Sequence, residues 1–172
     1  DDWRWYERNA KLTRFLLVGE YCIWNMPGEY AFRHLKADGV AKSMAMYDWL
    51  IKWELAMQGL ITDYDDVEYG TTITKTFIDG TSQPECNVMP SKYNNKAFAY
   101  SDDTGYMDAT NYRAHFNNNT LGTILPYDNI IQGGGYFWGP AHEFGHQNQG
   151  AINMPGCTEV SNNLLSEVGN FM

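Results

Sequence analysis

Hydrophobic residues recur at helical spacing in the segment from Val40 to Gly59. They form two adjacent stripes, with Val40, Met44, Tyr47, Ile51 and Leu55 in one and Met46, Leu50, Trp53 and Met57 in the other. Two adjacent stripes make a wide apolar face, which is typical of a helix buried on the core of a domain. The segment therefore predicts a core helix packed against a sheet, with its methionines in the core rather than on a binding surface.

Two segments after this helix have the pattern of a β-strand. TTITKTFI, residues 71–78, is rich in β-branched residues, and YMDATNYRAHF, residues 106–116, alternates between apolar and polar side chains. The alternation predicts one half-buried strand whose polar face, with Arg113 and His115, borders either a cleft or ordinary solvent. The intervening stretch GTSQPECNVMPSKYNN is rich in Pro, Asn and Ser, which predicts a loop.

Shorter helices are predicted towards the end of the chain. Residues 120–131 read as a helix that breaks at Pro126, and the glycines at 133–135 read as a flexible join. PAHEFGHQNQ, residues 140–149, is the next helix, because proline suits a first turn and Gly150 suits the end of a helix.

Composition limits the class of protein. A chain of 172 residues with 44% hydrophobic residues suits one globular domain with a proper core. The net charge of −9 argues against nucleic acid or anionic membranes as partners, and no run approaches the roughly 18 to 20 apolar residues of a membrane span. The cysteines, Cys22, Cys86 and Cys157, are widely spaced, and we expect three buried thiols rather than a disulfide with one free thiol.

The strongest chemical signal is a His-Glu-x-x-His motif within the helix predicted at 140–149. Residues four apart lie on one face of a helix, so His142 and His146 are placed to offer one imidazole nitrogen each to a single Zn²⁺. Glu143 follows the first histidine and is placed to take a proton from a water that attacks a carbonyl. The motif predicts a zinc peptidase, and the competing interpretation is a helix whose histidines only form hydrogen bonds in the core.

The motif alone does not identify the third ligand. A metzincin would have glycine and histidine where this chain has Gln149 and Ile152. A carboxylate from the following helix is the alternative, and Glu159 begins a segment in which Val160, Leu164, Leu165 and Val168 have helical spacing. The helix dipole favours an ionised carboxylate in the first turn. The remaining candidates are Glu167 and Cys157.

Polar residues near the third ligand are candidates for orienting the histidines. Asn162 and Asn163 lie one turn after Glu159, where an amide oxygen could accept the ring N–H of a ligating histidine and set its tautomer. Capping or exposure to solvent explains one of the two asparagines equally well.

HEFGHQNQ, the glutamate of TEVSNN and the upstream YMDATNYRAHF together resemble the enhancin-like zinc metallopeptidases, which are gluzincins. The resemblance extends from the helix near Val40 to the end of the chain. It implies an α+β, zincin-like core in which a mixed sheet packs on the His-Glu-x-x-His helix. By position it assigns zinc to His142, His146 and Glu159, and the role of general base to Glu143.

The resemblance also implies a substrate and a location. Substrates are expected among O-glycosylated, mucin-like proteins, and the protein is expected to be secreted or attached to the surface of a bacterium. Family catalytic domains continue where this chain ends at Met172, so we expect residues 1–172 to be a single, truncated catalytic domain. The alternative function is a glycoprotein- or carbohydrate-binding module that keeps the fold without cutting, which the high aromatic content would also suit.

Overall fold

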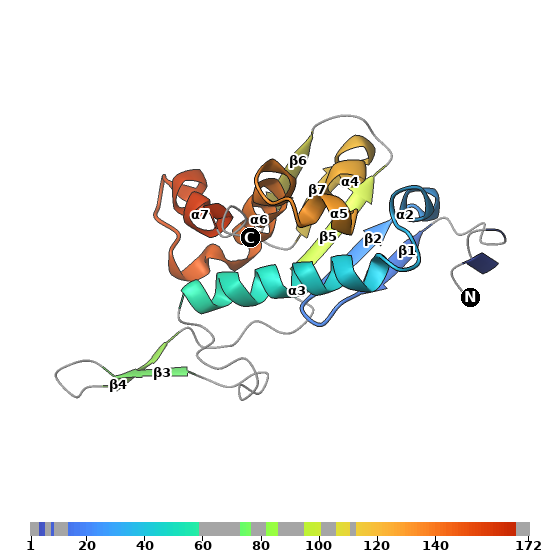
Figure 1. Ribbon diagram of the computed structural model, residues 1–172. Helices are drawn as coiled ribbons and strands as arrows, with labels where there is room; N and C mark the ends of the chain where they lie inside the picture. The colour runs from blue at the N-terminus through green and yellow to red at the C-terminus, as the bar shows by residue number, and fades with distance from the viewer. Residues whose placement is uncertain are drawn as a thin grey trace.

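The computed structural model describes residues 4, 5, 8, 14–58, 73–76, 82–85, 95–100, 106–110 and 113–167, and only the backbone of 73–76, 82–85 and 95–100. Within these ranges the chain forms a five-stranded sheet, a two-stranded ribbon and a set of helices on the larger sheet (Figure 1). None of the described helices has the length and apolar composition that crossing a membrane requires.

The five-stranded sheet is mixed, as predicted. Its order is β1 (Phe15–Val18), β2 (Cys22–Met26), β5 (Asn95–Tyr100), β7 (Arg113–Asn117) and β6 (Met107–Thr110). The three inner strands run parallel, whereas β1 and β6 pair antiparallel with their neighbours. Strand β6 is therefore an edge strand.

The described helices pack beside this sheet. They are α2 (Gly28–His34), α3 (Val40–Met57), α4 (Asn118–Ile124), α5 (Tyr127–Ile130), α6 (Gly135–Asn148), the 3-10 turn η1 (Gln149–Ala151) and α7 (Thr158–Ser166). Helix α6 is central, because it packs against the sheet through β5, β6 and β7 and also contacts α3 and α7 (Figure 1).

Aromatic rings join the sheet to the helices. Trp24 of β2 is fully buried, and its ring centroid lies 4.9 Å from Tyr47 of α3, 5.2 Å from Phe116 of β7 and 5.8 Å from Phe144 of α6. Each of these rings removes a large apolar area from water, which is the main stabilising contribution to such a core. The orientation of α6 on the sheet is set by this cluster.

The prediction for α3 is correct for one stripe and partly wrong for the other. Met44, Tyr47, Ile51 and Leu55 are buried, as is Leu50. Trp53 and Met57, however, are 43% and 50% exposed. The buried face turns instead towards α6, where it includes the polar residue Glu54.

The strand predictions need two corrections. The segment predicted as one strand contains two antiparallel strands, β6 and β7, in which Thr110 pairs with Arg113. The predicted strand at 71–78 is present as β3 (Ile73–Thr76), but its partner β4 (Ser82–Glu85) lies in the stretch that was predicted as a loop. Pro84 favours a turn by itself, but it is compatible with this pairing. Both strands of a two-stranded ribbon are edge strands, where the missing N–H of proline is tolerated.

The cysteine prediction is also wrong in part. Cys22 is buried, but Cys157 is exposed, and Cys86 lies outside the described residues.

Helix α6 begins at Gly135, earlier than the predicted start at Pro140. Gly133 and Gly134 have φ of 64° and 57°, so they form a defined turn rather than a flexible join. The turn places Phe137 in the core before the proline is reached, and burial of that ring favours a helix that already exists there. Pro140 lies in the second turn and leaves one carbonyl of the first turn without its helical donor.

A buried polar contact joins α3 to the end of α6. The Nδ2 of Asn148 donates to Oε2 of Glu54 at 2.6 Å, and both side chains are almost fully buried. Burial raises the pKa of Glu54 well above its ordinary value, although the hydrogen bond from Asn148 acts in the opposite direction. The folded protein thus binds a proton at Glu54 in a pH range where the unfolded chain has released it.

We therefore expect Glu54→Gln to raise the free energy of unfolding at pH 7 by about 1 to 3 kcal/mol, since the amide keeps the acceptor for Asn148 and has no charge to lose. The wild type should lose stability as pH rises above about 4.3, the pKa of an unfolded glutamate, and the gain from the variant should vanish below it. Urea unfolding between pH 4 and 8 measures this, with the exposed Glu29→Gln as control. Parallel curves for wild type and Glu54→Gln would contradict the account.

Candidate metal centre

Helix α6 presents two different faces. Phe137, Ala141 and Phe144 are fully buried against the core. His142 and His146 lie on the face turned towards α7, with side chains 14% and 12% exposed. Their rings meet edge to face with centroids 4.8 Å apart, and Trp138 stacks on His142 at 5.2 Å. The apolar face therefore holds the helix in place while the other face offers its histidines to a ligand.

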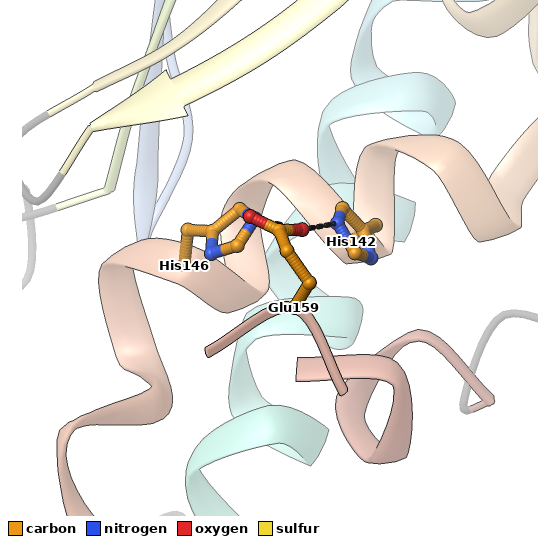
Figure 2. A group of neighbouring side chains, drawn as sticks. All are labelled: His142, His146 and Glu159. Atoms are coloured by element: carbon orange, nitrogen blue, oxygen red, sulfur yellow. Dashed lines mark hydrogen bonds and ion pairs between the residues drawn. The ribbon is translucent and has the colours of Figure 1, made fainter. Parts of the chain in front are cut away.

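Glu159 lies in the first turn of α7 and points at both histidines (Figure 2). Its Oε2 is 3.0 Å from Nε2 of His142 and 3.3 Å from Nε2 of His146. One donor atom from each of the three residues lies within 4.8 Å of the others. The structure thus brings together the three residues that the sequence predicts as ligands.

The donor set suits a zinc ion. Two imidazole nitrogens and one carboxylate oxygen are zinc ligands of catalytic sites, with bonds of about 2.0 to 2.2 Å that require donors a few ångströms apart. Among the described residues, the group contains neither of the alternatives. Glu167 lies just after the last residue of α7. Cys157 lies just before the first residue of α7, and its side chain is exposed. The assignment of zinc to His142, His146 and Glu159 remains a prediction.

Ring partners of the histidines differ from those predicted. The Nδ1 of His142 lies 3.1 Å from Oγ of Ser166, and Nδ1 of His146 lies 2.8 Å from Nε2 of Gln149. Asn162 instead donates its Nδ2 to the backbone carbonyl of His142 at 2.6 Å. Sequence reasoning missed Ser166 and Gln149 as ring partners. The only signal for them was position, since Ser166 follows Asn162 by one helical turn and Gln149 follows His146 by three residues.

Helix α7 packs on α6 through a polar face. Ser161, Asn162, Leu165 and Ser166 are its buried residues. Val160 and Leu164, which the sequence placed in an apolar stripe, are 63% and 58% exposed, and Val168 lies outside the described residues. The prediction failed for a physical reason. Helix α7 packs on the face of α6 that carries the histidines, and the polar groups buried there need hydrogen-bonding partners, which aliphatic side chains cannot supply.

Close approach of the two helices requires a glycine. A Cβ at Gly145 would overlap the Asn162 side-chain amide and lie 3.3 Å from the Cβ of Leu165. The absence of a side chain at this position lets Asn162 reach the carbonyl of His142. Gly145, between the two histidines, thereby sets the distance at which Glu159 is held.

Glu143 is buried beside the histidines. Only 6% of the residue is exposed. Burial raises the pKa of its carboxyl to about 7, and the negative charges of Asp108 and Glu159 contribute to the increase. Burial also lowers the pKa of His146, an effect that the charge of Glu159 opposes. Glu143 therefore takes up a proton more readily than an exposed glutamate does.

The polar face of β6 and β7 is not a simple solvated surface. His115 is buried, and its Nδ1 lies 2.6 Å from Oδ2 of Asp108. The other carboxylate oxygen of Asp108, Oδ1, lies 3.9 Å from Nη1 of Arg113. Asn111 lies outside the described residues.

A groove of about 450 Å³ runs between the edge strand β6 and the candidate ligands. Its lining residues are Ala109, Thr110, His146, Gln147, Gln149, Gly150, Asn153, Thr158 and Glu159. Two of its walls are therefore β6, which is the last strand of the sheet in the part of the chain that the structure describes, and the face of α6 that carries the histidines. Extended peptides can add to the outer strand of a sheet through backbone hydrogen bonds, which makes this groove a candidate peptide site.

Comparison with known proteins supports the resemblance. Residues 2–170 match the family model described as peptidase M60, enhancin and enhancin-like. No curated protein matches the chain.

Several solved structures are similar. A metallopeptidase from Bacteroides thetaiotaomicron is 28% identical over 94% of this chain and 23% of its own, with a TM-score of 0.66. A metallopeptidase in complex with Tn antigen is 27% identical over 99% of this chain and 27% of its own, with a TM-score of 0.69. A protein of unknown function from Bacillus anthracis str. Ames is 25% identical over 96% of this chain and 30% of its own, with a TM-score of 0.70.

These similarities confirm the predicted α+β, zincin-like core. This chain spans about a quarter of the length of the first two proteins and slightly more of the third.

The choice of third ligand can be tested by replacing the two glutamates of the α7 region in turn. Glu159→Ala should lower zinc affinity by about 100-fold or more, because two histidines alone hold the metal poorly. Glu167→Ala removes the same group from an exposed position outside the cluster and should leave the affinity nearly unchanged. Competition with a chromophoric chelator gives both affinities, and equal losses in the two variants would refute the assignment.

The close approach of the helices gives a second test. Gly145→Ala should lower the free energy of unfolding by about 1 to 3 kcal/mol through overpacking, and should weaken zinc binding by displacing α7. Gly150→Ala is the matched control, since a Cβ there meets nothing within 4 Å. Thermal unfolding and zinc titration together decide the point. An unchanged affinity in Gly145→Ala would mean that α7 does not hold Glu159 in place.

Proposed function

Since this chain belongs to the peptidase M60 family of enhancin and enhancin-like proteins, we propose that it is the metal-binding part of a zinc-dependent endopeptidase that acts on O-glycosylated, mucin-like proteins. The convergence of the His142, His146 and Glu159 donor atoms within 4.8 Å of one another is the observation that carries the proposal. A structural role for the histidines alone would not require a carboxylate from a separate helix to point between them.

His142, His146 and Glu159 would hold the metal. When bound, Zn²⁺ supplies Lewis-acid chemistry, because it polarises a carbonyl and makes water more acidic. The backbone carbonyl of His142 is held by Asn162 and its ring by Ser166, so this histidine has little freedom to turn away.

Glu143 is the proposed general base. It directly follows His142 on α6, and its carboxyl is buried on the same helix as the two ligands. In this role it takes a proton from the attacking water and returns it to the amine that leaves when the peptide bond breaks. Burial limits the access of bulk water to the carboxyl.

The groove along β6 is the proposed binding site for the peptide. A substrate paired with the edge strand would lie over the face of α6 that carries His146 and beside Glu159. Backbone pairing of this kind is tolerant of side-chain identity, which suits a peptidase that selects its substrates by another feature.

A glycan is the proposed selective feature. One similar metallopeptidase was solved in complex with Tn antigen, which supports a glycoprotein substrate for this chain too. A protein that degrades mucin-like substrates meets them outside the cell, so we propose that this one is secreted or displayed on the surface of a bacterium.

The decisive variant is Glu143→Gln. It should bind zinc as the wild type does but lose about 100-fold or more in the rate of mucin cleavage, because the ligands are intact while the proton acceptor is gone. Fragments are detected on gels after incubation of mucin with the wild type, with the variant and with the wild type plus chelator. Cleavage by Glu143→Gln at the wild-type rate would contradict the assignment of the base.

Deglycosylated mucin serves as the substrate control. A peptidase that reads a glycan should cut intact mucin and spare the deglycosylated protein. Capture of mucin without any fragments, by wild-type protein loaded with zinc, would favour the binding-module alternative instead.

A further inference from the structure

Gln149 connects a candidate metal ligand to the helix that carries another. Its side chain is almost fully buried, at 4% exposure, in the turn that follows α6. Its Nε2 donates to Nδ1 of His146 at 2.8 Å, and its Oε1 accepts from Oγ of Ser161 at 3.4 Å. Ser161 Oγ also lies 3.1 Å from the carbonyl of Thr158, in the first turn of α7. A continuous chain of hydrogen bonds therefore runs from His146 to the turn that holds Glu159.

This arrangement suits only one tautomer of His146. When Nδ1 accepts a hydrogen bond from Gln149, the ring proton of neutral histidine is on Nε2. That nitrogen lies 3.3 Å from Oε2 of Glu159, to which it can donate. The tautomer is therefore compatible with a hydrogen bond between the ligands but not with a metal on Nε2.

Metal binding reverses the requirement. A histidine that ligates through Nε2 needs its lone pair there, so the ring proton must be on Nδ1. Nδ1–H would then face the Nε2–H of Gln149 across 2.8 Å, with two donors opposed and no acceptor between them. One of the two groups has to change.

The Gln149 amide can resolve this conflict without moving its neighbours. Rotation of the amide by about 180° exchanges an oxygen and an NH₂ group of nearly the same size. Oε1 then accepts from Nδ1–H of His146, and Nε2 donates to Oγ of Ser161. The single hydroxyl proton of Ser161, which has two acceptors in the metal-free arrangement, then donates to the carbonyl of Thr158 alone, so every group in the chain is satisfied.

We propose that Gln149 is a positioning residue whose side-chain amide turns over when His146 takes up a metal, and that it couples the tautomer of this ligand to the first turn of α7. The proposal rests on the proposed function only in taking His146 as a ligand. Glutamine is suited to the position because one side chain offers both a donor and an acceptor. A carboxylate could serve the metal-bound tautomer only, and an apolar side chain could serve neither.

Zinc affinity of two variants tests the proposal. Gln149→Met keeps the length of the side chain but has no effective hydrogen-bonding group, and should bind zinc about 10- to 100-fold more weakly. Gln149→Glu restores an acceptor for Nδ1–H and should bind within about threefold of the wild type, or more tightly. The control is Gln132→Met, where the same change is made at an exposed glutamine that donates to the carbonyl of Asp128.

The tautomer itself is visible in the nitrogen-15 spectrum of histidine-labelled protein, which has only four histidines to resolve. His146 should carry its proton on Nε2 without metal and on Nδ1 with zinc. In uniformly nitrogen-15-labelled protein, the side-chain NH₂ signals of Gln149 should shift between the two forms. In Gln149→Met the metal-free ring should lose its preference for the Nε2–H tautomer.

The possible results separate two failures. Equal affinities for wild type and Gln149→Met, or a loss in Gln149→Glu as large as that in Gln149→Met, would overturn the role of Gln149 alone. An Nδ1–H tautomer already present in the metal-free protein would do the same, because the amide would have no reason to turn. A wild type that takes up no zinc at all would overturn the proposed function, and the inference with it.

Discussion

The packing of α7 on α6 is the contact on which the candidate site depends. The candidate ligands come from two helices, and only a close approach of these helices brings Glu159 between the two histidines. The approach rests on the missing side chain at Gly145 and on the hydrogen bond from Asn162 to the carbonyl of His142. Because this carbonyl belongs to His142, a candidate ligand, one hydrogen bond positions both α7 and the histidine that lies beside Glu159.

Helix α6 can support the packing of α7 because its opposite face is buried in the core. Rings from a strand, from α3 and from α6 itself surround Trp24 and hold the helix against the sheet. At its end, Asn148 reaches a buried carboxyl on α3, which adds a directional hydrogen bond to the non-directional apolar packing. The aromatic packing and this hydrogen bond thus fix the position of the histidine-bearing face from the opposite side of α6.

Sequence reasoning succeeded where short-range chemistry decides the outcome. The spacing of the two histidines follows from helix periodicity, and the helix that the sequence places from Glu159 onward is present as α7, one residue earlier at Thr158. These two predictions led to the cluster that the structure shows. It was less successful for features that depend on tertiary contacts. The pairing of β3 with β4, the exposure of Trp53 and the polar packing of α7 each depend on which surfaces meet, and neither periodicity nor propensity contains that information. Ser166 and Gln149 were missed for the same reason, since only the folded structure shows which ring nitrogen lies beside them.

The placement of Glu159 has a kinetic consequence. Its side chain is 74% exposed, and it belongs to the first turn of a helix of nine residues. Helix ends open locally at far lower free energy than a core does, so this candidate ligand can move away from the histidines while α6 stays folded. Exchange of a bound ion would then be governed by fraying of one turn, on a timescale independent of global unfolding. The two histidines, fixed on the central helix, would keep the half-site ready for an incoming ion between such openings.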